Sequence, residues 1–251
     1  MSSARSLERF AGILMLDTRF PRPPGDVGHD ATFTFPVRRR VVRTATPIRA
    51  VRAPEAGLSD AFIVAARALA AQGAALIGTS CGFLALQQRE LAASVPVPVA
   101  TSSLLQVGWL RAVLPRERTV GVVTIDAQSL SAAHFAAVGV TGDVPIEGVD
   151  PGGEFATRLL NDEPALDAAR ACDEVVAAAQ RLVARRPDVA AIVLECTNMP
   201  PYAAAVAHAT GRPVYDVVTL LTSLWCGIAP ASYQPHPRTG PPLEGEGETL
   251  R

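Results

Sequence analysis

The sequence predicts an α/β fold built on parallel sheets flanked by helices. Short apolar runs alternate with helical segments along most of the chain, and strands joined by helical crossovers pair in parallel. Hydrophobic residues make up 49% of the chain and aromatic residues only 5%, so we expect an aliphatic core. At 251 residues the chain is long enough for one large domain or for two smaller ones.

The first expected elements are a buried strand and a long loop. Residues 11–17 are predicted to form the strand, and the Pro/Gly-rich stretch 18–33 that follows is not expected to be helical. A loop of that length is either functional or disordered. Segment 38–52 alternates enough to predict another strand, and Ser59 is the predicted N-cap of a helix that ends at Gly73. Further strands are expected at 74–78, 95–103, 119–126, 144–150, 189–195 and 212–217, and further helices at 82–94, 104–114, from 128, at 164–185, at 202–209 and from 219.

The two ends of the chain predict where the protein is located and which segment is disordered. The apolar run at 11–17 is too short for a secretory signal or a membrane span, so we expect a cytoplasmic protein that does not contact a membrane. In that reducing compartment the four cysteines are expected to be free thiols. The Pro/Gly-rich segment 231–251 is expected to be a disordered tail.

Composition excludes several classes of function. The formal charge of −1 and the absence of a broad basic surface argue against a nucleic-acid partner. All 23 basic residues are arginine, and without a lysine neither a pyridoxal phosphate enzyme nor a lysine-nucleophile aldolase is possible. Neither cysteines nor histidines have the spacing of zinc ligands, so no metal is expected.

One local pattern occurs twice. In "LIGTSCGFL" (76–84) and in "IVLECTNMPPY" (192–202), an apolar strand stops, a cysteine follows, and a helix begins. Ligands of parallel sheets bind beyond the carboxyl ends of the strands, so Cys81 and Cys196 occupy positions typical of a binding site. As a simpler alternative, a free cysteine is a small buried apolar residue, and this is how we interpret Cys172 and Cys226.

A cysteine at a helix N-terminus is expected to have a pKa below its ordinary value of about 8.5. Two such thiols on opposite sides of one ligand could exchange protons on two faces of a carbon atom. The charge that develops on the ligand needs nearby hydrogen-bond donors. The candidates for this role are Thr79, Ser80, Gly82, Phe83, Thr197 and Asn198.

At these residues the chain resembles the aspartate/glutamate racemase superfamily, which includes hydantoin racemases, maleate isomerases and arylmalonate decarboxylases. "VLECTNMP" is similar to the superfamily's second-cysteine motif and "GTSCGFL" to the first. The resemblance implies two pseudo-symmetric flavodoxin-like lobes with the active site in the cleft between them. It also implies that Cys81 and Cys196 are the catalytic pair, that Thr197 binds a substrate carboxylate, and that no cofactor is needed. The lobes expected from it are 1–114, completed by the last strand and helix at 214–230, and 115–213.

The chain departs from the glutamate racemases at three places. Gly82 and Phe83 stand where aspartate and glutamate racemases usually have Asn-Thr, Asn198 replaces a histidine, and the first strand does not lead into an Asp-Ser corner. The loss of a side-chain amide beside Cys81 removes donors and gives room, so the substrate is either an amino acid such as aspartate or glutamate or a larger derivative such as a hydantoin.

Two further pairs have alternative roles. Arg22 with Asp26 is either a carboxylate clamp with its orienting partner or a surface salt bridge. Ser102 and Ser103 either cap the next helix or bind substrate.

The hypothesis from sequence is a cofactor-independent racemase or epimerase that inverts the carbon α to a carboxylate. Its partners are a small-molecule carboxylate substrate and, in one reading, a second copy of the chain in a homodimer. Maleate isomerase and arylmalonate decarboxylase chemistry are alternatives, although decarboxylases work with only one of the two cysteines. "GTSCG" also matches G-x-S-x-G, which would make Ser80 a hydrolase nucleophile, and a non-catalytic small-acid binding protein is the remaining alternative.

Overall fold

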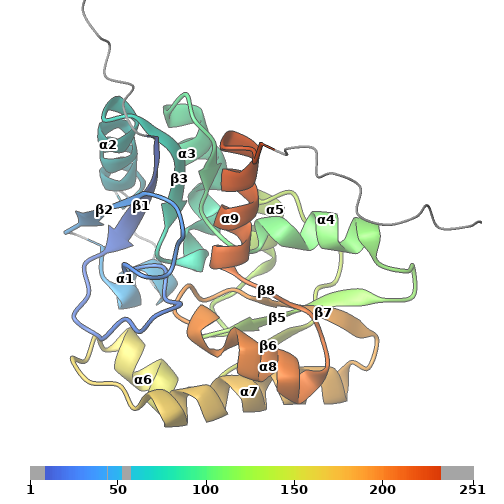
Figure 1. Cartoon of the computed structure of the whole chain (residues 1–251). Coiled ribbons are helices and arrows are strands. Elements are labelled where there is room, and N and C mark those ends of the chain that lie inside the picture. The colour runs from blue at the N-terminus through green and yellow to red at the C-terminus, as the bar shows by residue number, and fades with distance from the viewer. Residues whose placement is uncertain (1–8, 44, 53–57, 233–251) are drawn as a thin grey trace, which may run out of the picture.

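The computed structural model describes residues 9–43, 45–52 and 58–232, and it contains two four-stranded parallel sheets flanked by helices (Figure 1). The predicted α/β class with two lobes is confirmed. The segment 231–251, expected to be a disordered tail, lies outside the described residues except for its first two positions.

The first sheet has the strand order β2-β1-β3-β4. Its strands are β1 (Phe10–Leu16), β2 (Val37–Val42), β3 (Ala74–Thr79) and β4 (Val99–Ala100). The central strand β1 is buried along its whole length, whereas the edge strand β2 alternates and leaves its arginines partly in solvent. Segment 38–52 is therefore the end of a strand followed by a short helix, and not one long strand.

Helices cover both faces of this sheet. The helices of this part of the chain are α1 (Pro47–Arg52), α2 (Leu58–Ala71), the 3₁₀ helix η1 (Gly82–Gln87), α3 (Gln88–Ser94) and α4 (Leu105–Val113). Phe62 and Leu69 of α2 pack on one face. On the other face, Leu220 and Leu221 of α9 (Val217–Ile228) pack against Ile13 and Leu76.

The second sheet repeats the arrangement with the order β6-β5-β7-β8. Its strands are β5 (Thr119–Thr124), β6 (Ile146–Gly148), β7 (Val189–Leu194) and β8 (Val214–Tyr215). Its helices are α5 (Ala132–Ala137), α6 (Glu154–Leu160), α7 (Ala168–Arg185), the 3₁₀ helix η2 (Pro200–Tyr202) and α8 (Ala203–Thr210). The strand that precedes each cysteine, β3 or β7, pairs with β1 or β5, and in both pairs the register shifts at the first residues. This match supports the repeated pattern seen in the sequence.

The structure differs from the expected lobe boundary at the last strand. We expected both the last strand and the last helix to complete the first lobe, but β8 pairs with β7, with Val214 opposite Ile192, and so extends the second sheet. Only α9 returns to the first lobe, because its apolar side chains cover the open face of β1 and β3. Within the part of the chain that the structure describes, no helix is long and apolar enough to cross a membrane.

Candidate active site

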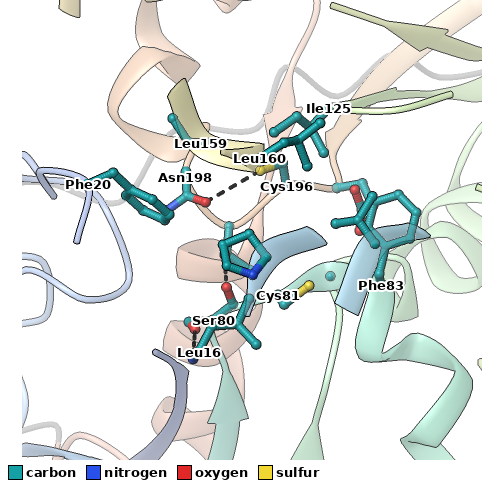
Figure 2. A pocket seen from close by; sticks show the side chains of 15 residues that line it. Leu16, Phe20, Ser80, Cys81, Phe83, Ile125, Leu159, Leu160, Cys196 and Asn198 are labelled. Atoms are coloured by element: carbon teal, nitrogen blue, oxygen red, sulfur yellow. Dashed lines mark hydrogen bonds between the residues drawn. The ribbon is translucent and has the colours of Figure 1, made fainter. Parts of the chain in front are cut away.

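The two cysteines lie at the carboxyl ends of β3 and β7, one in each lobe, and both line one cavity between the lobes (Figure 2). The corners that carry them are in direct contact, since the Thr197 hydroxyl donates a hydrogen bond of 2.7 Å to the Ser80 carbonyl. Both side chains are nearly buried, with 6% of Cys81 and 7% of Cys196 exposed. The structure therefore brings the two predicted thiols together at one cavity, while their catalytic role stays a prediction.

The cavity is small, since the centre of a water-sized sphere can occupy only about 30 Å³ of it. Most of its wall is apolar, and it draws on both lobes. The first lobe contributes Leu16, Phe20, Pro47, Val51, Ser80, Cys81, Gly82 and Phe83, and the second contributes Ile125, Leu159, Leu160, Glu195, Cys196, Thr197 and Asn198. Among the described residues no three His, Cys, Asp or Glu side chains are grouped as metal ligands would be.

The pKa of each thiol moves in the opposite direction from our expectation. Burial and, to a smaller extent, the Glu195 carboxylate raise the pKa of Cys81 to about 12, although the Phe83 and Leu84 amides lower it in part. Burial also raises the pKa of Cys196 well above its ordinary value. The helix after Cys81 begins as the short 3₁₀ helix η1, and its amides do not offset the loss of water. In the free protein both cysteines are therefore thiols at neutral pH.

The hydroxyls predicted to bind substrate are bonded to the backbone. Thr79 donates to the Thr101 carbonyl at 2.6 Å and does not line the cavity. The Ser80 hydroxyl accepts the Leu16 amide at 2.8 Å. Neither Ser80 nor Thr197 has a histidine among its hydrogen-bond partners in the described residues, which disfavours the hydrolase alternative for Ser80.

Ser102 and Ser103 are fully buried and do not line the cavity. The Ser102 hydroxyl accepts the Leu104 amide at 3.3 Å, just before α4. Ser103 donates to the Leu194 carbonyl at 2.7 Å and so ties the first lobe to the end of β7.

The loop 18–33 reaches the second corner through a buried chain of polar groups. The Arg22 guanidinium donates to Asp26 at 2.8 Å, and the Asn198 amide donates to the other oxygen of Asp26 at 2.6 Å. The Asn198 carbonyl oxygen in turn accepts the Cys196 thiol at 3.6 Å, as Figure 2 shows. Arg22 does not line the cavity, but its positive charge lowers the pKa of Cys81. The pair is thus neither a surface salt bridge nor a clamp that opens directly into the cavity.

Sequence analysis missed Glu195, which lines the cavity and is completely buried. Its Oε2 accepts the Thr124 hydroxyl at 2.8 Å, while its Oε1 has no hydrogen-bond partner among the residues that the structure describes. Burial raises the pKa of this carboxyl to about 7. The available signal was a single acid at the end of the otherwise apolar run "VAAIVLE".

Comparison with solved structures identifies the class of fold. A sulfate-associated variant of arylmalonate decarboxylase matches with a TM-score of 0.61 and 18% identity, over 90% of this chain and 97% of that one. Glutamate racemase from Bacillus anthracis matches with a TM-score of 0.57 and 15% identity, over 88% of this chain and 83% of that one. The aspartate racemase of Picrophilus torridus matches with a TM-score of 0.51 and 14% identity, over 88% of this chain and 94% of that one. The fold is that of the aspartate/glutamate racemase superfamily, as the resemblance implied.

Curated relatives narrow the class to a family. A dimethylsulfoniopropionate lyase from Durusdinium sp. clade D is 31% identical over 223 residues, which cover 82% of this chain and 71% of the relative. Dimethylsulfoniopropionate lyase 5 from Emiliania huxleyi is 32% identical over 230 residues, or 84% of this chain, but these span only 44% of that longer relative. No family model matches the sequence. The chain belongs to the dimethylsulfoniopropionate lyase family.

Proposed function

We propose that the protein is a lyase that removes the proton α to a carboxylate and expels a leaving group from the β carbon, with dimethylsulfoniopropionate as its substrate. The observation that carries the proposal is the pair of cysteines, one from each lobe, at one small and mostly apolar cavity. Membership of the lyase family supports this reaction over the inversion of a stereocentre, which we expected from the sequence.

The chemistry is a β-elimination. A thiolate takes the proton from the carbon next to the carboxylate, the electron pair of that C–H bond forms the C=C bond, and the C–S bond breaks. The products are acrylate and neutral dimethyl sulfide, and the thiolate has become a thiol that later releases its proton to water. No oxidant, reductant or cofactor enters this balance.

The substrate itself supplies what the free site lacks. Both thiols are protonated in the free protein because burial and the nearby carboxylate disfavour a thiolate. A bound sulfonium group brings a permanent positive charge into the cavity, and an opposite charge within a few ångströms favours the ionised form of a thiol. The base therefore forms when the substrate binds.

A second candidate, a racemase or epimerase, is supported by the retention of both cysteines. Elimination needs a base on one face of the carbon only, whereas inversion needs a proton donor on the other face as well. Two other reactions of the superfamily would use the same cavity, namely those of maleate isomerase and arylmalonate decarboxylase.

One experiment separates these reactions. The purified protein is incubated in deuterated water with dimethylsulfoniopropionate, and in parallel with D- and L-amino acids, 5-substituted hydantoins, maleate and arylmalonates. We expect dimethyl sulfide in the headspace and acrylate in solution in equal amounts. Deuterium at the α carbon together with loss of optical activity, and no dimethyl sulfide, would instead support the racemase.

A further inference from the structure

Glu195 is a buried acid that the elimination described above does not use. None of its surface is exposed, and one of its oxygens, Oε1, has no hydrogen-bond partner. Its carboxyl group lies against the backbone of Gly82, where a Cβ atom would stand only 2.2 Å from Oε1. Glu195 is therefore placed between the two corners, next to Cys196 in the chain and against the residue that follows Cys81.

The described residues around this carboxyl offer it no positive charge. The groups that face it are the Thr124 hydroxyl on β5 and the two thiols. His134 of α5 contacts the ring of Phe83 and does not line the cavity. Arg22, the nearby arginine, already pairs with Asp26. Burial raises the pKa of Glu195 to about 7, and Thr124 lowers it only in part. A buried carboxylate without a counter-charge is costly, and a cation that enters the cavity would remove that cost.

The cavity wall near Glu195 suits a cation of a particular kind. Figure 2 shows Phe83 and Ile125 on one side of the cavity and Phe20 and Asn198 on the other. A sulfonium or quaternary ammonium group is covered by methyl groups, so aromatic and aliphatic walls bind it well and need not donate hydrogen bonds to it. On the Asn198 side, the Asn198 amide and the Arg22 guanidinium both donate to Asp26, so the charge and donors there are already paired.

We propose that Glu195 is the counter-charge for a permanent cation, and that the site selects a ligand with an onium group over a neutral ligand of the same shape. This inference rests on the proposed function, since it assigns a recognition role within the same site. The charge of Glu195 would orient the ligand with its onium group toward Glu195 and Phe83. This orientation would determine which carbon atoms lie between the thiols.

The test uses two unreactive ligands of nearly the same shape. 3-(Trimethylammonio)propanoate carries the cation, whereas 4,4-dimethylpentanoate has a neutral carbon in its place. Isothermal titration calorimetry at pH 8, where Glu195 is ionised, gives both affinities. We expect the wild-type protein to bind the cationic ligand about tenfold more tightly or better, because an opposite charge in a buried site is worth more than about 1 kcal/mol.

The Glu195→Gln variant keeps the shape of the side chain and removes the charge. We expect its preference for the cationic ligand to fall to about one, with the affinity for the neutral ligand kept. Glu90→Gln is the matched control, because Glu90 is an exposed residue of α3 and does not line the cavity. Equal preference in the wild type and Glu195→Gln would overturn the proposal, and so would a wild-type protein that prefers the neutral ligand or binds neither.

A second variant covers the case in which Glu195→Gln does not fold. Thr124→Val removes the one hydrogen bond that the described residues make to the Glu195 carboxylate, and it should raise the pKa of Glu195 by about one unit. The preference for the cationic ligand should then be lost at pH 7 and return at pH 9, and a preference that does not change with pH in this variant would contradict the proposal. If the wild-type protein selects the cationic ligand but releases no dimethyl sulfide, the proposed reaction fails while the role of Glu195 stands.

Discussion

At the scale of single residues, the two cysteines have matching positions but need not have matching roles. For an elimination, one thiol is the base and the other only lines the cavity. We expect Cys81→Ser and Cys196→Ser to be unequal, with one variant losing at least about 100-fold in kcat for dimethyl sulfide release and the other losing much less. Cys226→Ser is the control, because Cys226 is exposed and does not line the cavity. If both site variants lost activity equally, chemistry on two faces of the carbon would be favoured.

The charge of Glu195 should also appear in the stability of the protein. The pKa of this carboxyl is raised by burial from 4.5 to about 7, so the folded state binds the proton more tightly than the unfolded state does. The contribution of this carboxyl to the free energy of unfolding is therefore greatest below pH 4.5. About 3 kcal/mol of it is lost as the pH rises to 7. Urea unfolding at pH 5 and pH 8 measures the loss, and Glu195→Gln should lack it. An identical pH dependence in both proteins would show that the carboxyl is not desolvated.

Gly82 is the residue that leaves room for this carboxyl. A Cβ at position 82 would lie 2.2 Å from Oε1 and 2.3 Å from the backbone oxygen of Glu195, and backbone does not yield cheaply. We expect Gly82→Ala to lower the free energy of unfolding by about 1–3 kcal/mol and to reduce activity. Gly108→Ala is a useful comparison, since nothing lies within 4 Å of a Cβ there and a helical alanine should be neutral or stabilising. Chemical denaturation of the two variants measures the difference.

Residue patterns in the sequence identified some of the site and missed the rest for a physical reason. Cys81 and Cys196 could be predicted because a cysteine at the end of a strand and the start of a helix has a position that local sequence defines. The burial of Glu195 could not, because an acid at the end of a strand is usually solvated, and only the packing of Gly82 against it removes the water. The raised pKa of each thiol has the same cause, since dipole arguments use local structure and desolvation depends on the whole fold.

At the scale of elements, α9 shows how a helix far along the chain is fixed to the first lobe. Asp216 caps it and accepts the Thr219 amide at 2.8 Å, and the Gln106 side chain donates to the Asp216 carbonyl at 2.9 Å. Asp216→Ala should therefore lower the free energy of unfolding by about 1–2 kcal/mol and the melting temperature by several degrees. Asp216→Asn keeps a capping oxygen and should lose much less. Differential scanning calorimetry measures both, and an equal loss would mean that the charge and not the cap is what stabilises α9.

The kinds of element were easier to predict than their partners. The strands predicted at 74–78 and 189–195 match β3 and β7 to within one residue at each end. They were predictable because central strands of a parallel sheet are apolar along their whole length. Helix α6 was missed, since it is short and follows a Pro/Gly-rich turn. The assignment of β8 to the first lobe was wrong because two residues of strand carry no pattern that says which neighbour they pair with.

At the scale of the whole molecule, two ion pairs join the lobes beside the cavity. Arg19 pairs with Asp162 at 3.1 Å, and Arg52 pairs with Asp126 at 2.9 Å. Each pair flanks residues that line the cavity, because Arg19 precedes Phe20 and Arg52 follows Val51. The ion pairs are partly exposed, so each should contribute less than about 1 kcal/mol to the stability of the fold.

These pairs should matter more for access than for stability. Because both thiols are nearly buried, we expect a ligand to reach them when the lobes separate. We expect the double variant Arg19→Ala, Arg52→Ala to increase the rate of iodoacetamide labelling of Cys81 and Cys196 several-fold, as read by mass spectrometry, while labelling of the exposed Cys226 stays constant. Arg181→Ala is the matched control, because it removes a pair with Glu147 that lies within the second lobe. If the double variant labelled no faster than this control, access would depend on motion of the loop 18–33 alone, since that loop carries Phe20 and reaches Cys196 through Asn198.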